Sequence, residues 1–174
     1  MAFSLYDAIV PSWLQMLGTV SHLIDKAEAW CTEREVPPAT LIEARLADDM
    51  LPFAYQVKST AVHSQGAFEG VFRGTFSPDT TTPPDSFQGL RDRIAAARSA
   101  IEALDRAEVE ALIGRDMAFV VGDVRRLEFT ADQFLLSFSQ PSFYFHVTTA
   151  YAILRERGVA IGKRDYLGQM RIKG

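Results

Sequence analysis

The sequence predicts an all-α fold, a four-helix bundle with a small β-hairpin before its last helix. Apolar residues recur at intervals of three and four along four long stretches, which is typical of amphipathic helices. Loops rich in proline, glycine and small polar residues separate these stretches. One short change of period, ahead of the last stretch, indicates the hairpin. Because 174 residues is the usual size of one domain, we expect a single domain over residues 1–174.

The first helix is expected from Ser4 to about Glu33. Ser4 can cap it, and Asp7 suits the positive end of a helix. Pro11 should kink its first turns, and the Pro37-Pro38 pair lies beyond its end. Its apolar positions share one face: Trp13, Leu17, Val20, Ile24, Ala27 and Cys31.

A short helical piece, Thr40–Leu46, precedes the second long helix. Asp48 or Asp49 is expected to cap that helix, because Pro52 is tolerated in a first helical turn. The helix should end near Gly74. Its predicted buried stripe consists of Met50, Ala54, Val57, Ala61, Phe68 and Val71.

The segment Ser77–Asp85 is a polar, proline-rich loop, and the third helix follows over Ser86–Leu104. Next come two short apolar runs, Met117–Val121 and Leu127–Phe129. They flank a Gly-Asp turn at 122–123, which predicts a β-hairpin.

The last long helix is expected to start at a capping box, Thr130–Gln133, and to run to Arg157. Pro141 should kink or break it, and Gly158 should stop it. We expect the tail, Val159–Gly174, to be irregular.

Composition excludes several classes of protein. The formal net charge of −4 gives no general attraction to nucleic acid or to anionic membranes. No apolar run reaches the roughly 18 residues of a membrane span. The N-terminal stretch contains Asp7 and lacks a basic flank, unlike a signal peptide, and the single Cys31 suits a reducing compartment. We therefore expect a cytoplasmic protein with neither a nucleic acid nor a membrane as its partner.

A polar stripe runs along the second helix through Asp49, Gln56, Thr60 and His63. It is either a solvated flank of the helix or the lining of a groove. Arg45 lies four residues before Asp49, so if Asp49 is only a helix cap, Arg45 is its expected partner.

His146 lies in an apolar stretch, Phe143–Tyr151, where an unpaired imidazole would cost about 1–3 kcal/mol. It is either a core histidine bonded to another helix or a metal ligand or proton carrier. Helical metal sites often place two ligands four residues apart, but the positions here are Ser142 and Ala150. We therefore expect no stoichiometric transition metal, and no complete catalytic motif assigns catalytic residues.

Five parts of the chain carry a family resemblance: Ser4–Asp7, Pro11, Ala44–Met50, Pro141–Tyr151 and Gly162–Gly168. Together they resemble an uncharacterised bacterial domain-of-unknown-function family, numbered nineteen ninety-three, of the DinB-like/YfiT-like superfamily. The resemblance implies a four-helix bundle, commonly dimeric. Many members of the superfamily bind a divalent metal through three histidines, one on the second helix and an H-x-x-x-H pair on the last. Some of these transfer thiol groups or isomerise small molecules with a thiol cofactor.

This chain matches that histidine pattern only in part. His146 is similar to one member of the last-helix pair, and His63 lies on the corresponding second helix, but Ala150 stands where the other histidine of the pair would be.

The leading hypothesis is a protein of unestablished function with a small-molecule pocket. Its candidate residues are Asp49, Gln56, His146, Arg45 and Tyr144. The alternative is a metal- or thiol-cofactor-dependent transferase or hydrolase with a degenerate metal site. In that case the weak candidate ligands are His63, His146 and Asp49, around a divalent metal. The sequence does not decide whether the protein is an enzyme.

The last helix also predicts a homodimer. Phe143, Val147, Ala150 and Leu154 make one apolar face. Phe138, Phe145, Ala152 and Ile153 lie largely off that face. A second subunit related by a two-fold axis would cover this second apolar set, unless the hairpin covers it instead.

Overall fold

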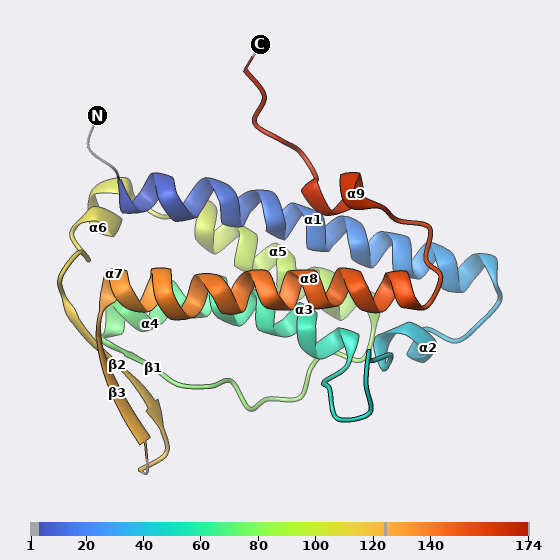
Figure 1. Ribbon diagram of the computed structural model, residues 1–174, viewed down its shortest axis with the longest axis horizontal. Helices are drawn as coiled ribbons and strands as arrows, with labels where there is room; N and C mark the ends of the chain where they lie inside the picture. The colour runs from blue at the N-terminus through green and yellow to red at the C-terminus, as the bar shows by residue number, and fades with distance from the viewer. Residues whose placement is uncertain (1–3, 124, 174) are drawn as a thin grey trace.

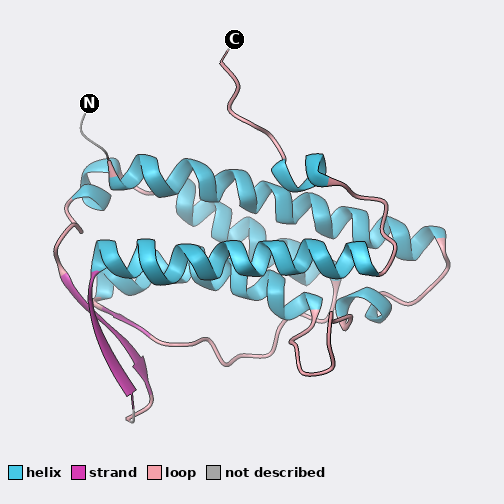
Figure 2. Ribbon diagram, in the orientation of Figure 1, coloured by secondary structure: helices cyan, strands magenta, loops and turns pink. Residues whose placement is uncertain are grey.

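The computed structural model describes residues 4–123 and 125–173, and it is mainly helical with a small three-stranded sheet at one end (Figures 1 and 2). The helical prediction is therefore confirmed, but the fold is not purely α. A third strand pairs with the two that the sequence predicts. Residues 1–3 and 174 of the predicted domain, and Val124 after the predicted turn, lie outside the described residues.

The first helix, α1 (Leu5–Glu33), has Pro11 within it and precedes the short α2 (Ala39–Ile42). Ser4 is its N-cap, as predicted: the Ser4 hydroxyl accepts a hydrogen bond from the Asp7 N–H at 3.2 Å. The predicted apolar stripe of α1 is fully or almost fully buried: Trp13, Leu17, Val20, Ile24, Ala27 and Cys31.

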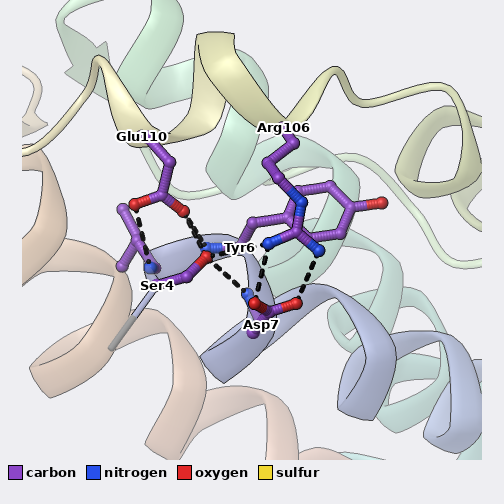
Figure 3. Close-up of polar contacts among 6 residues, drawn as sticks. Ser4, Tyr6, Asp7, Arg106 and Glu110 are labelled. Atoms are coloured by element: carbon purple, nitrogen blue, oxygen red, sulfur yellow. Dashed lines mark hydrogen bonds and ion pairs between the residues drawn. The ribbon is translucent and has the colours of Figure 1, made fainter. Parts of the chain in front are cut away.

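A side-chain network from α6 (Arg106–Glu110) holds the start of α1 in place (Figure 3). The Glu110 carboxylate accepts hydrogen bonds from the Ser4 hydroxyl at 2.5 Å and the Tyr6 N–H at 2.9 Å. Arg106 donates two hydrogen bonds to the Asp7 carboxylate, at 2.6 and 2.7 Å. Two of the N–H groups that a helix leaves without partners in its first turn, those of Tyr6 and Asp7, are thus satisfied by side chains.

The second helical run has three parts: α3 (Phe53–Ala61), the π-helical η1 (Val62–Gly66) and α4 (Ala67–Arg73). It ends at Gly74, as predicted. Gly74 has φ +84°, a left-handed conformation that favours glycine and closes helices.

The predicted cap of this run is wrong. The N-cap is Pro52, with no side-chain hydrogen bond, and α3 starts only at Phe53. Asp48 and Asp49 lie in an exposed turn before it, too far along the chain to reach the free N–H groups of the helix.

The sheet consists of β1 (Thr75–Phe76), β2 (Asp116–Val121) and β3 (Arg125–Thr130). β1 pairs with β2 in parallel, with Phe76 opposite Phe119, and β2 pairs with β3 antiparallel. Two residues are too few for the sequence to show an alternating pattern, which is why β1 was not predicted.

Between β1 and α5 (Phe87–Glu102), the 77–86 loop runs from the sheet end of the molecule back along the second helical run (Figure 1). Ser86 caps α5: its hydroxyl accepts from the Gly89 N–H at 3.1 Å. The third predicted helix is thus confirmed to within two residues at its end.

The last run consists of α7 (Ala131–Gln133), the π-helical η2 (Phe134–Ser139) and α8 (Gln140–Glu156). The wide π turns end just before Pro141, a residue that lacks an N–H and whose ring crowds the preceding turn. This is the irregularity that the sequence predicts at Pro141.

Two predictions for this part of the chain are wrong, namely the capping box at Thr130–Gln133 and the irregular tail after Gly158. Thr130 is the N-cap of α7, but its side chain makes no cap hydrogen bond. Asp132 instead accepts from the Gly114 N–H at 3.0 Å, so the carboxylate is used outside the helix. The tail is not wholly irregular, because it contains α9 (Lys163–Leu167) beside α1.

The long helices pack α1 against α5 and α3 against α8. α1 and α8 run in one direction along the molecule, and α3–α4 and α5 run in the other (Figure 1). Trp13 lies at the centre of the core, stacked on Phe143 at 5.1 Å and edge-on to Phe68 at 5.5 Å between ring centroids. Among the residues described, no helix combines the length and hydrophobicity needed to cross a membrane.

Candidate functional site

The two π-helical segments come together at the sheet end of α3 and α8. η1 carries His63, η2 ends at Ser139, and His63 Nδ1 lies 3.4 Å from Ser139 Oγ. A π turn displaces the residues that follow it around the helix, and such turns are frequent at functional sites. Both helices that form this region therefore depart from regular geometry where they carry polar side chains.

The rings of His63 and His146 stack, with centroids 5.5 Å apart and planes at 19°. His146 Nδ1 is 2.8 Å from Gln56 Oε1, and Gln56 Nε2 donates to the Leu51 carbonyl oxygen at 2.8 Å. The Leu51 carbonyl can only accept, so it fixes the orientation of the Gln56 amide. The amide oxygen then requires a proton on His146 Nδ1, which leaves His146 Nε2 as an acceptor.

Both histidines are neutral at pH 7. Burial, and to a smaller extent the neighbouring His146, lowers the pKa of His63 to about 4. Burial lowers the pKa of His146 to about 4 as well. A proton on either ring would be poorly solvated, and protons on both rings would repel each other.

A small cavity of about 110 Å³ lies beside His63. Six structural segments contribute to it: α3, η1, β1, the 77–86 loop, β2 and η2. Its lining residues are Tyr55, Ser59, Val62, His63, Phe76, Pro78, Asp79, Phe119 and Phe138. The site is therefore an aromatic pocket whose lining residues include one histidine, one carboxylate residue and two residues that carry a hydroxyl, Tyr55 and Ser59. His146 is not among the lining residues, but its ring stacks on that of His63.

A buried lysine ties the 77–86 loop to α3 beside this pocket. The side chain of Lys58 is 3% exposed, and its ammonium group lies 3.1 Å from the Asp79 carboxylate. The same group donates to the carbonyl oxygens of Asp79 at 2.9 Å and Thr81 at 2.5 Å. Burial would raise the pKa of Asp79, but hydrogen bonds from Thr81 and Lys58 outweigh it and the pKa is lowered. Asp79 is thus a carboxylate whose charge is compensated.

Of the predicted pocket candidates, Gln56 and His146 come together, and His63 joins them. Asp49 and Arg45 do not: both are exposed in the segment before α3, and within the described residues no ion pair joins them. The helix that the sequence predicts to present Asp49 starts four residues after it, so Asp49 does not share a helix face with Gln56 and His63.

Tyr144 also lies outside the site. It is two residues from His146, and residues at that spacing point to different sides of a helix. Its ring packs edge-on to Phe143 at 5.5 Å. Burial raises the pKa of its hydroxyl, with a hydrogen bond from Ser12 of α1 acting in the opposite sense. Tyr144 thus faces α1 rather than α3.

Sequence reasoning missed Lys58, Asp79 and Ser139. The sequence does indicate that Lys58 is unusual, because this charged residue lies four residues after Ala54 and three before Ala61, on the apolar face of its helix. Asp79 and Ser139 gave no such signal. Asp79 is one of many polar residues in its loop, and Ser139 reaches His63 only through two π turns.

The donor set does not fit a three-histidine metal site. His63 and His146 supply two imidazoles, and Ala150, fully buried, stands four residues after His146. Across residues 4–123 and 125–173, no three His, Cys, Asp or Glu side chains gather closely enough to hold a metal ion.

A second, broader hollow of about 900 Å³ lies between α1 and the C-terminal tail. Its wall includes His22, whose Nε2 lies 2.8 Å from the Asp165 carboxylate, and Arg171, which donates to the Pro11 carbonyl at 2.7 Å. None of the predicted site residues lines it. We therefore place the candidate site at the smaller cavity, which His63 lines.

Comparison with known proteins agrees with this architecture. A crystal structure of a DinB family member protein from Shewanella denitrificans is similar, with a TM-score of 0.83 and 29% sequence identity over 98% of this chain and 95% of that one. A comparison with curated proteins gives no match. The family model described as "Domain of unknown function (DUF1993)" matches residues 5–167, nearly the whole chain. The chain therefore belongs to the DUF1993 family and has a DinB-like fold.

Proposed function

We propose that this protein is a cytoplasmic, single-domain, DinB-like four-helix bundle that binds a small molecule in the aromatic pocket beside His63. His63 and His146 act there as a neutral imidazole pair. His63 forms part of the pocket wall, and His146 holds it in position.

The observation that carries the proposal is the stacking of two neutral imidazoles at the edge of a cavity. His63 and His146 are both half-buried, and even partial burial of an imidazole sacrifices hydration that an apolar side chain would not lose. Each ring has one nitrogen near a protein group: His146 Nδ1 lies near Gln56 Oε1, and His63 Nδ1 lies near Ser139 Oγ. Among the described residues neither Nε2 atom has a protein partner. Both therefore remain available for a ligand or for water.

The electrostatics favour binding over acid–base catalysis. A general base works best with a pKa near the working pH. With pKa values of about 4, these imidazoles accept hydrogen bonds at neutral pH but rarely take up a proton. A neutral pair of this kind is better suited to hydrogen-bonding a ligand than to abstracting a proton from it.

The metal- or thiol-dependent transferase or hydrolase is the weaker candidate. His63 and His146 lie on the helices that the superfamily resemblance implies, which is the one observation in its favour. It needs a third ligand, which the described residues do not place beside the two rings. Elemental analysis of untagged protein tests it: about one zinc or nickel per chain, lost in His146→Gln, would favour the enzyme.

The homodimer remains a prediction. Phe145 on α8 is 56% exposed, as an apolar residue at an interface would be in a separated subunit. Ile153, also expected off the core face, is instead fully buried within this chain, so it does not contribute. Light scattering at micromolar concentration should give twice the chain mass of 19.4 kDa, and Phe145→Ser should reduce it.

The binding proposal is tested by NMR of ring-labelled histidines during a screen of small organic molecules. We expect ligands that shift the His63 signals most, His146 less and His22 not at all, because His22 lies on α1 outside the pocket. A screen in which no compound shifts His63 or His146 would overturn the proposal.

A further inference from the structure

We infer that the pocket beside His63 takes an uncharged, ring-sized molecule with one hydroxyl group, of the chemical class of phenol. This inference rests on the proposed function and specifies its ligand.

The size of the pocket sets the first limit. The pocket volume of about 110 Å³ equals that of a few water molecules, since one water occupies roughly 30 Å³ in the liquid. An apolar cavity of about 150 Å³ suffices to bind benzene. The pocket is smaller than that, so a single six-membered ring is the largest group that it can hold, and a nucleotide, a sugar chain or a peptide is excluded.

The walls select for a flat ring. Phe119 and Phe138 pack at 5.0 Å between ring centroids, and Phe76 packs against Phe119 at 6.1 Å. His63 packs against Phe76 at 5.8 Å and against Phe138 at 5.7 Å. Aromatic rings attract one another in offset or edge-to-face arrangements at these separations, so a ligand ring gains more here than an aliphatic chain.

The charges in the wall select against ions. Asp79 is the charged residue among those that line the pocket, but Lys58 already pairs with its charge, and both Lys58 and Thr81 contact its Oδ1 atom. The ammonium group of Lys58 also lies 5.7 Å from the Tyr55 ring centre, the position in which a ligand cation would bind that ring. A charged ligand would lose its hydration here without gaining an unpaired counter-ion.

The polar groups select for a hydroxyl. His63 Nδ1 lies near Ser139 Oγ, and either atom can supply the proton between them. His63 Nε2 is accordingly an acceptor in one tautomer and a donor in the other. A hydroxyl group both donates and accepts, so it suits either tautomer, whereas a carbonyl or an ether suits one.

The test compares phenol with three molecules of similar size: toluene, benzylammonium and benzoate. Binding is followed at pH 7.5 by the NMR shifts of the His63 ring and by calorimetry. Wild type is compared with His63→Phe, which removes the hydrogen-bonding group, and His63→Gln, which restores one. His22→Phe is the matched control, the same substitution outside the pocket. Circular dichroism verifies that each variant is folded.

We expect phenol to bind best, about 2- to 10-fold more tightly than toluene, the factor that one net hydrogen bond provides. His63→Phe should abolish that preference, while His63→Gln should retain part of it and His22→Phe all of it. Tighter binding of benzylammonium or benzoate would overturn the ligand class and leave the pocket in place. The same holds if none of the four binds while another small molecule shifts His63. If no small molecule shifts His63 or His146, the proposed function itself fails.

Discussion

His63 and His146 stack at 5.5 Å between ring centroids, although they come from helical runs far apart in the chain. The pair is held on one side by Gln56, which bonds His146, and on the other by Ser139, which lies beside His63. Positions, protonation and exposure of both rings thus depend on the packing of α3–η1 against η2–α8.

Stability should fall on mild acidification because of this pair. Each histidine has a pKa of about 6.5 in the unfolded chain and about 4 in the folded one. Between these values the unfolded state binds protons that the folded state does not, so the free energy of unfolding decreases as pH falls through that window. The loss approaches about 3 kcal/mol per histidine near pH 4 and adds nothing further below it. Urea unfolding at pH 7, 6 and 5 measures it.

The control for that experiment is the double variant His63→Gln, His146→Gln, which should lose this part of the pH dependence, while His22→Gln should keep it. Parallel curves for wild type and the double variant between pH 7 and 5 would contradict the lowered pKa values.

Removing the partner of His146 should destabilise the protein. Gln56 is 2% exposed, and Gln56→Leu leaves the His146 N–H without its acceptor. We expect a loss of about 1–3 kcal/mol in the free energy of unfolding. Gln88→Leu is the matched control, because Gln88 is exposed and bonds only Asp92 one turn away, so the loss should stay under about 0.5 kcal/mol. Equal effects at the two positions would show that the Gln56–His146 bond contributes nothing particular.

The tie between Lys58 and Asp79 should behave as a buried ion pair. Asp79→Asn leaves the Lys58 charge buried with only carbonyl partners, so we expect a loss of about 3 kcal/mol. Lys58→Met should cost less, because Asp79 lies closer to solvent and can be hydrated. In a double-mutant cycle, the combined variant should be more stable than the sum of the single losses indicates. Additive losses would mean that the two side chains do not interact.

Substitution of the observed cap of α1, Ser4, and of the predicted cap of the second helix, Asp49, should have different effects on stability. Ser4→Ala removes the observed cap of α1 and should cost about 1 kcal/mol. Asp49→Ala should change the free energy of unfolding by less than about 0.5 kcal/mol, because Asp49 lies exposed before α3 and caps nothing. A loss of 1 kcal/mol at Asp49 would restore it as a cap.

Periodicity was sufficient to predict the long helices, because the stripe through Trp13, Leu17 and Ile24 and the stop at Gly74 are local features. It was not sufficient for β1, which has two residues, or for the start of α3, where Pro52 is the N-cap and Asp49 only resembles one. Local chemistry also indicated that His146 needs a partner on another helix. It could not identify Gln56, nor bring His63 beside His146, because both depend on the mutual packing of two helices that contain π turns.

Nitrogen-15 NMR of the histidine rings tests the central claim most directly, that His63 and His146 form a neutral pair at a small-molecule pocket. At pH 7, His146 should be neutral and protonated at Nδ1, both rings should titrate near pH 4, and phenol should shift His63 in the wild type. Rings that titrate near 6.5, together with a His63 signal that no small molecule shifts, would contradict the account.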